Sequence, residues 1–294
     1  MRWFLLFWLP LSLFSFGKVT YKYSTEPIDV VIPYHPKDFE TIDMCIDGIR
    51  ENGNNVRRII VVSKEPYVHK NAEWFDEKNY PFSREEVALE IFHGDAVKAE
   101  EFIKSPMSRI GWIFQQLLKL YAPFAIPGIS KNALILDSDV IFLKPTDFMN
   151  EQGQPYFTVG TNDTKEYFEH AAKLVQGLKR AKPNESGIVH HMLFQKVILD
   201  DLFQLIAMEH KCEPWKAICR CVDLGEIYKS CMSEYEIYFN FVALRTNQRT
   251  MRRLHWTEVI PTLPDPKYYK RLGYVFIASQ EWYRRWIKET GGRQ

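Results

Sequence analysis

The sequence predicts an α/β fold in which a mixed, mostly parallel sheet is flanked by helices within a single domain. Two β-branched runs, 28–32 (IDVVI) and 57–62 (RRIIVV), are separated by one helix-length segment, which is the spacing of a βαβ unit. A third apolar run, 133–136 (ALIL), follows a helical pattern over 108–124. A chain of 294 residues is long enough for one large domain with a substantial core.

Local signals define the elements of the first half in order. Residues 28–32 are expected to form a buried strand, because the apolar run is stopped by Pro33. Asp38 is expected to cap a helix that ends near Gly53. The run 88–92 (ALEIF) predicts a further strand. The apolar positions of the helix follow at helical spacing: Phe39, Ile42, Ile46 and Ile49.

The helix predicted over 108–124 has two distinct faces. One face is apolar and predicts contact with the core, through Ile113, Leu117, Leu120 and Phe124. Trp112, Gln116 and Lys119 share the other face at spacings of four and three residues. An ordinary solvent-exposed face with an extended lysine is the alternative interpretation of this second group.

Two aspartates with one serine between them, Asp137 and Asp139, follow the apolar run 133–136. On a strand, residues two apart face the same side, so both carboxylates are expected to point one way. Like charges this close repel each other unless a cation lies between them. The alternative is a solvated turn, where aspartate is common. Ligands of open α/β sheets bind outside the carboxyl ends of strands, which favours a ligand site here.

Composition and charge narrow the function classes. Lysine and arginine total 38 against 37 aspartates and glutamates, so no overall positive field favours nucleic acid as a partner. The composition is that of a globular protein, with 46% hydrophobic and 26% charged residues. The sequence therefore favours a globular protein whose partners do not include nucleic acid.

The first 17 residues, MRWFLLFWLPLSLFSFG, have the layout of a signal peptide. A positive residue precedes an apolar run that is shorter than the roughly 18 to 20 residues that span a bilayer comfortably. Cleavage is favoured, and an uncleaved signal anchor is the alternative. Either interpretation predicts a protein of the secretory pathway or one associated with a membrane through its N-terminus.

The five cysteines are interpreted in that context. Cys45 lies within the first predicted helix, and the remaining four are clustered in one short stretch: Cys212, Cys219, Cys221 and Cys231. In an exported protein such a cluster favours two disulfides, in any of three pairings. Free thiols and a zinc site are the alternatives, although the spacings match no regular zinc motif.

The order of these motifs resembles a known enzyme family. An early V-V-I-P strand, a W-x-x-x-Q-x-x-K helix and then L-I-L-D-S-D-V-I-F-L-K-P are similar to metal-dependent glycosyltransferases of the GT-A fold. The resemblance covers residues 28–145 and implies a Rossmann-like, GT-A-like architecture. It divides the domain, 26–294, into a nucleotide-sugar and metal half (26–150) and an acceptor half (151–294).

The resemblance implies a divalent cation, Mn²⁺ or Mg²⁺, that bridges the diphosphate of a nucleotide-sugar donor. Asp139 is the expected direct ligand, and Asp137 is expected to contact the metal, directly or through water, or the donor ribose. Tyr34 is expected to stack on the nucleotide base. Lys119 is expected to reach a donor phosphate, with Gln116 on the same helix face at the donor site.

The second half is expected to supply the acceptor site for a glycan, lipid or protein hydroxyl. His191, one of two adjacent histidines predicted to enter a helix, is the favoured site residue over His190. Ser233 and Glu236 form a capping-box pattern, which leaves Glu234 as the candidate catalytic base or as a charge complementing the helix dipole. His255 is the candidate third metal ligand by its position in the chain.

Two other functions fit parts of the sequence. A haloacid-dehalogenase-like phosphatase also uses Asp-x-Asp after an apolar strand, but that family places its motif on the first strand. An exported, lectin-like or degenerate protein that binds sugar without catalysis is the non-enzymatic alternative. The position of Asp137 after several predicted strands favours the transferase, a hexosyl or related transferase, among these.

Near the C-terminus, an aromatic and basic segment is predicted to form a helix. It contains Trp282, Tyr283, Arg284, Arg285 and Trp286. A helix docked on the domain is favoured, and a helix lying on a membrane surface is the alternative.

Overall fold

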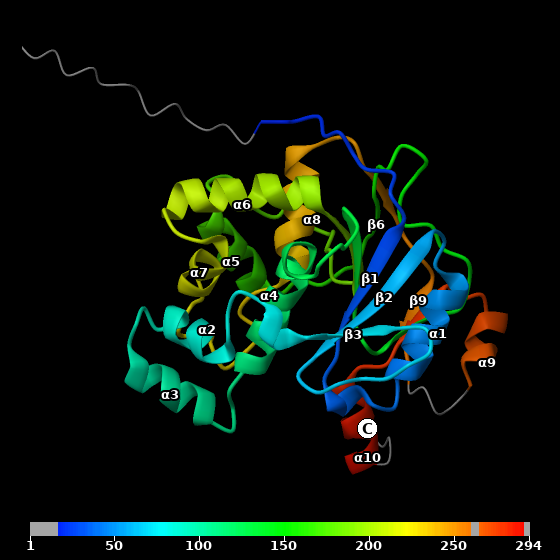
Figure 1. The fold of residues 1–294 in the computed structure, drawn as a ribbon, viewed down its shortest axis with the longest axis horizontal. Helices are drawn as coiled ribbons and strands as arrows, with labels where there is room; N and C mark the ends of the chain where they lie inside the picture. Colours follow the sequence, from blue (N-terminus) through cyan, green and yellow to red (C-terminus); the bar gives the residue numbers. More distant parts are fainter. Residues whose placement is uncertain (1–16, 260–264, 291–294) are drawn as a thin grey trace, which may run out of the picture.

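The centre of the computed structural model is a five-stranded sheet in the order β3-β2-β1-β4-β7 (Figure 1). β1 pairs in parallel with β2 and β4, β2 pairs in parallel with β3, and only β7 runs antiparallel to its neighbour β4. The structure describes residues 17–259 and 265–290. The strand bounds are β1 Ile28–Pro33, β2 Val56–Ser63, β3 Glu73–Asp76, β4 Asn132–Leu136 and β7 His191–Gln195.

Two smaller sheets lie beside the central one. The first has the order β5-β10-β9, and the second pairs β6 with β8. Their strands are β5 Val140–Phe142, β10 Phe276–Ala278, β9 Trp256–Glu258, β6 Tyr156–Thr158 and β8 Thr250–Arg252. The first small sheet matters for the site, because β5 follows β4 directly in the chain.

Helices cover both faces of the central sheet (Figure 1). Val31 and its same-face neighbours pack against α2 to α8, whereas Val30 and Ile32 pack against α1 on the opposite face. Burial on both faces explains why these strands are continuous apolar runs. The helices are α1 Ile42–Asn52, α2 Arg84–Ile91, α3 Ala96–Lys104, α4 Ile110–Ala125, α5 Lys165–Leu174, α6 Lys196–His210, α7 Pro214–Arg220, α8 Glu234–Arg245, α9 Pro266–Arg271 and α10 Glu281–Thr290, with short 3₁₀ turns η1 Pro36–Asp38 and η2 Glu77–Asn79.

This architecture confirms the predicted single-domain α/β class with a mostly parallel sheet, and it is compatible with a Rossmann-like fold. The strands expected over 28–32 and 57–62 and the helix expected over 108–124 are present as β1, β2 and α4. β7, from the second half of the chain, completes the sheet beside β4.

Two predictions in the first half are wrong. Residues 88–92 belong largely to α2, because Ser83 forms a capping box with Glu86 and starts a helix there. Asp38 does not cap α1: Thr41 occupies the N-cap position, and Asp38 lies in η1 with a buried side chain.

The two aspartates also differ from the expectation of one strand face. β4 ends at Leu136, and β5 begins at Val140 in the neighbouring sheet. Asp137 and Asp139 therefore lie on the connection between two sheets, at the carboxyl end of β4.

The adjacent histidines do not enter a helix. His190 has a left-handed backbone, with φ of 65°, and His191 begins β7. The helix that follows, α6, starts only at Lys196.

All five cysteines are free thiols, so the predicted disulfides are absent from the part of the chain that the structure describes. The predicted leader lies, apart from Gly17, outside the described residues. Over residues 17–259 and 265–290, no helix is both long and apolar enough to cross a membrane.

Candidate functional site

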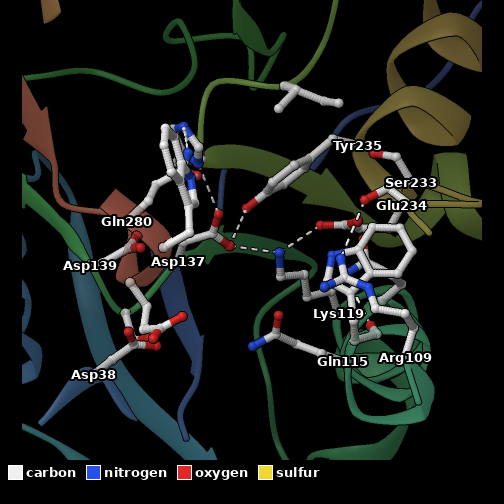
Figure 2. A pocket seen from close by; sticks show the side chains of 18 of the residues that line it. Asp38, Arg109, Gln115, Lys119, Asp137, Asp139, Ser233, Glu234, Tyr235 and Gln280 are labelled. Atoms are coloured by element: carbon white, nitrogen blue, oxygen red, sulfur yellow. Dashed lines mark hydrogen bonds and ion pairs between the residues drawn. The ribbon is translucent and has the colours of Figure 1, made fainter. Parts of the chain in front are cut away.

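A cavity of about 440 Å³ opens at the carboxyl end of β4 (Figure 2). It is walled by α4, by the connection between β4 and β5, by the first turn of α8 and by the start of α10. Most of its lining side chains are polar or charged. The structure thus brings together five of the predicted site residues: Gln116, Lys119, Asp137, Asp139 and Glu234.

Lys119 lies at the centre of this group. Its Nζ is 2.6 Å from Asp137 Oδ1 and 2.7 Å from Glu234 Oε1, and it lies 4.5 Å from the centre of the Tyr235 ring (Figure 2). Burial opposes the charged form of Lys119, but the two carboxylates outweigh this effect and raise its pKa. Lys119 is therefore a buried, permanently charged bridge between two acidic residues.

Asp137 has donors on both carboxylate oxygens. Besides Lys119, Tyr235 Oη donates to Oδ1 at 3.2 Å and His190 Nδ1 lies 3.2 Å from Oδ2. Burial alone would favour the neutral acid, but Lys119 and His190 reverse this and lower the pKa of Asp137. Asp137 is accordingly an ionised group whose negative charge is balanced by the protein itself.

Asp139 has a different environment. Its Oδ1 is buried and has no hydrogen-bond partner among the described residues. Burial first, and then the charge of Asp137, raise the pKa of Asp139 to about 6. Asp139 is therefore the carboxylate of the pair that the described residues leave without a hydrogen-bond donor on Oδ1.

Glu234 is the first residue of α8 and is buried. Burial raises its pKa even though Lys119 acts in the opposite direction. The predicted capping box is only half present: Ser233 accepts from Glu236 N, but the Glu236 carboxylate bonds to Ser186 and Asn240 instead. Glu234 takes no part in the cap and faces the cavity.

His191 is placed away from the cavity, which contradicts its predicted role. It is buried among aromatic rings, with Nε2 3.2 Å from Thr158 Oγ1 and Nδ1 3.0 Å from the Val189 carbonyl oxygen. Burial lowers its pKa to about 3, so it is a neutral core residue. Its neighbour His190 lines the cavity, because the left-handed backbone turns the two side chains in different directions.

His255 does not join the aspartates. It is exposed and stacks on Tyr274, with ring centres 4.1 Å apart, and it is not part of the cavity wall. Within the described ranges, no group of three or more histidine, cysteine, aspartate or glutamate residues is arranged to hold a metal ion. A protein-derived third ligand at His255 is therefore not supported, and any cation at Asp139 needs ligands from its substrate or from water.

Tyr34 lines a second cavity, of about 250 Å³, at the carboxyl ends of β1 and β2. Its ring lies 5.1 Å from that of Tyr67. The two cavities adjoin, because they share wall residues: Lys37, Arg109, Trp112 and Gln115.

Several residues of the site were not predicted, and Arg109 is the most informative of them. Its guanidinium lies 5.2 Å from the ring centre of Trp112, and its Nη2 donates to Ser230 Oγ at 3.3 Å. Its Nε is buried without an acceptor, and no carboxylate pairs with it in the described part of the chain. Arg109 lies three residues before Trp112 and therefore on the same helix face as Trp112, Gln116 and Lys119. This spacing was the available signal for Arg109 as a site residue.

Comparison with known proteins places the chain in a family without assigning it an activity. No curated protein matches the sequence. A family model described as "Family of unknown function (DUF6492)" matches residues 27–289, which is most of the chain and includes every residue of the cavity. The chain therefore belongs to this family of unknown function.

Proposed function

We propose that the protein is a metal-dependent glycosyltransferase that moves a sugar from a nucleotide-diphosphate-sugar donor to an acceptor hydroxyl. The observation that carries this proposal is the unpartnered carboxylate oxygen of Asp139 at a polar cavity, next to Asp137 and Glu234, which share the cation Lys119. Asp139 is thus available to a cation, while the other two acidic residues already contact Lys119.

The donor set of the site fits a hard divalent cation. Asp139 Oδ1 is an unpartnered, buried carboxylate oxygen, and Mn²⁺ and Mg²⁺ are held by oxygen ligands, commonly one or two carboxylates with substrate phosphates and water. When bound there, such a cation neutralises the charge that develops on the leaving diphosphate. Asp137, already bonded to three donors, supports the site by orienting its neighbours.

The adjoining cavities match the two ends of a nucleotide sugar. Tyr34 in the smaller cavity is positioned for a base, and the acidic pair in the larger one for the sugar and its activated bond. Lys37 and Arg109 line both cavities, and neither forms an ion pair within the described residues, so they can bind a diphosphate between the two ends. Lys119 is buried and already forms two ion pairs, so it is not the main phosphate ligand in this proposal.

Glu234 is the residue best placed to accept the proton of the acceptor hydroxyl. Its carboxylate lines the larger cavity, and its raised pKa makes it a stronger base than an exposed glutamate. Lys119 holds Glu234 Oε1 at 2.7 Å and fixes its direction. The acceptor can thus approach the sugar from the α8 side of the cavity.

The phosphatase alternative would require Asp137 as a nucleophile. Its two oxygens already receive hydrogen bonds from Lys119, His190 and Tyr235, which oppose that role. The contacts of Asp137 therefore favour the transferase over the phosphatase.

A calorimetric titration of the purified chain tests the proposal. UDP, GDP, CMP and UDP- and GDP-sugars are each added with Mn²⁺ and, separately, with EDTA. Binding of one nucleotide diphosphate only in the presence of Mn²⁺ is expected, and transfer of the sugar to added acceptors should follow. Absence of binding to all of them, in a protein with a cooperative unfolding transition, would overturn the proposal and favour the non-catalytic sugar-binding alternative.

A further inference from the structure

The segment Ser279–Arg284, more than 130 residues beyond the acidic pair in the chain, is linked to all three residues of the Asp137–Asp139 connection, directly to Asp139 and indirectly to the other two. Figure 2 shows Gln280 beside the acidic pair, with Asp38 below it. The backbone N–H of Ser279 donates to the Asp139 carbonyl oxygen at 2.9 Å. The other two contacts pass through one intermediate side chain each.

Arg284 reaches the central serine through Asp38. Arg284 Nη2 donates to Asp38 Oδ1 at 2.7 Å, and Asp38 Oδ2 accepts from Ser138 Oγ at 2.9 Å. All three side chains are buried, with exposed fractions of 3–4%. The guanidinium also donates to the carbonyl oxygens of Lys37 and Ser279. It therefore connects η1, which contains Asp38, with the residue that is bonded to Asp139.

Gln280 reaches Asp137 through His190. Gln280 Nε2 lies 3.0 Å from His190 Nε2, and His190 Nδ1 lies 3.2 Å from Asp137 Oδ2. These contacts are consistent with one direction of donation, from Gln280 to His190 and from His190 to Asp137. Two side-chain relays and one backbone bond thus converge on three consecutive residues.

Packing does not explain why α10 is held here. None of the α10 residues that the structure describes belongs to a hydrophobic core cluster, although the helix carries Trp282, Tyr283 and Trp286. Three ion pairs join it to the η1 region: Arg284 with Asp38 and with Glu40, and Lys288 with Glu40. A buried ion pair is weak evidence for stability, but it fixes geometry, because its partners must meet in one arrangement.

We infer that Arg284 is a positioning residue, which sets the conformation of the Asp137–Asp139 connection through Asp38 and Ser138 and thereby the affinity of the site for a divalent cation. The inference rests on the proposed function, since it takes Asp139 to be the cation ligand. Residues that orient metal ligands commonly change metal affinity 10- to 100-fold when they are replaced.

The test measures Mn²⁺ binding by the full chain, first with Mn²⁺ alone and then with UDP or GDP added, each against a blank without protein, and free Mn²⁺ is followed by electron paramagnetic resonance. Arg284→Met breaks the relay at its start, and Ser138→Ala breaks it at its end with the loss of a single hydroxyl. Lys288→Gln is the matched control: it removes an exposed α10 ion pair with Glu40, which also lies 3.7 Å from Arg284 Nε, and it leaves the hydrogen bonds of the relay in place.

Arg284→Met is expected to weaken Mn²⁺ binding at least about tenfold, and Ser138→Ala by a smaller factor in the same direction. The double variant should bind no more weakly than Arg284→Met, because both changes interrupt one relay. Arg284→Lys keeps the positive charge but loses the several N–H donors of the guanidinium group, so it should restore only part of the Mn²⁺ affinity. Lys288→Gln should bind Mn²⁺ like the unaltered chain.

The outcomes separate this inference from the proposed function. If the unaltered chain binds Mn²⁺ and both relay variants bind it equally well, Arg284 is structural only, and the inference fails while the function stands. If Arg284→Met does not fold, the Mn²⁺ affinity of Ser138→Ala still tests the inference. If the unaltered, folded chain binds no Mn²⁺ either alone or together with UDP or GDP, both the inference and the proposed metal-dependent function are overturned.

Discussion

The ammonium group of Lys119 lies 2.7 Å from the carboxylate of Glu234, a residue 115 positions further along the chain. The same ammonium group neutralises Asp137 at 2.6 Å. Two carboxylates from different elements, the partly buried Asp137 and the buried Glu234, therefore share one cation. Loss of Lys119 would leave both without it.

Lys119→Met is expected to lower the free energy of unfolding by about 3–5 kcal/mol, because it leaves buried charges without a partner. Urea unfolding at neutral pH, followed by circular dichroism, measures the change. Lys104→Met is the control, because Lys104 pairs with Glu100 on an exposed helix surface. Equal stability of the two variants would show that the ion pairs of Lys119 with Asp137 and Glu234 do not stabilise the fold.

Asp139→Asn is expected to abolish Mn²⁺-dependent nucleotide binding and to leave stability unchanged or slightly higher. The amide removes a negative charge that burial and Asp137 disfavour, while it keeps the size of the side chain. Calorimetry with Mn²⁺ and a nucleotide diphosphate, together with thermal unfolding, measures both effects. Asp147→Asn, at an exposed aspartate, should change neither. Retained Mn²⁺-dependent binding in folded Asp139→Asn would refute the metal site.

Arg109→Gln is expected to weaken nucleotide diphosphate binding roughly 10- to 100-fold, the range for losing a hydrogen bond to a charged group. Binding of the matching nucleoside, which has no phosphates, should change little. Titration of both ligands makes the comparison within one variant. Arg220→Gln, at an arginine that pairs with Glu90 outside the cavities, serves as the control. An equal loss for nucleoside and diphosphate would argue against a phosphate contact.

The buried His170 is expected to make the folded protein less stable in mild acid. It is buried, its Nε2 lies 2.9 Å from the Ile218 carbonyl oxygen, and burial lowers its pKa to about 4. Its pKa in the unfolded chain is about 6.5, so the unfolded state binds the proton first as the pH falls. The contribution of neutral His170 is complete above pH about 6.5 and declines toward pH about 4.

The size of this effect is at most roughly 3 kcal/mol, because one pKa unit corresponds to about 1.4 kcal/mol. Other groups, among them Asp139 with its raised pKa, titrate in the opposite direction. The difference between the unaltered chain and His170→Gln isolates the histidine. That difference should shrink between pH 6.5 and 4, and a difference independent of pH would contradict the prediction.

Two helical glycines are expected to respond oppositely to alanine. A Cβ at Gly48 would lie 2.9 Å from the Phe142 carbonyl oxygen, where α1 packs closely against β5, so Gly48→Ala should cost more than about 1 kcal/mol. A Cβ at Gly111 in α4 meets nothing within 4 Å, so Gly111→Ala should gain up to about 1 kcal/mol. Chemical unfolding of both variants tests the packing, and a gain at Gly48 would contradict it.

Much of the fold could be predicted from local patterns. β1 and β2 are apolar on both faces, and α4 has a clear helical stripe, so neighbouring residues suffice to define them. The strand expected over 88–92 was wrong because a short apolar run does not distinguish strand from helix. The capping box of Ser83 and Glu86 was the available signal for the helix.

The site was predictable only in part. Asp137, Lys119 and Glu234 stood out by residue type and spacing, and the structure joins them. Arg284 and Asp38 meet across 246 positions of the chain, and no local pattern indicates such a contact. His190 instead of His191 faces the cavity because of a left-handed backbone at a residue other than glycine, which local sequence patterns rarely reveal.

The Asp137–Asp139 connection joins strands of two different sheets, since β4 belongs to the central one and β5 to the smaller one. The distance between the two carboxylates is therefore set by the angle between those sheets as well as by side-chain rotation. A substitution in the core of either sheet that alters this angle would change the separation of Asp137 and Asp139 without touching either side chain. The spacing of the acidic pair is thus a property of both sheets and not of three consecutive residues alone.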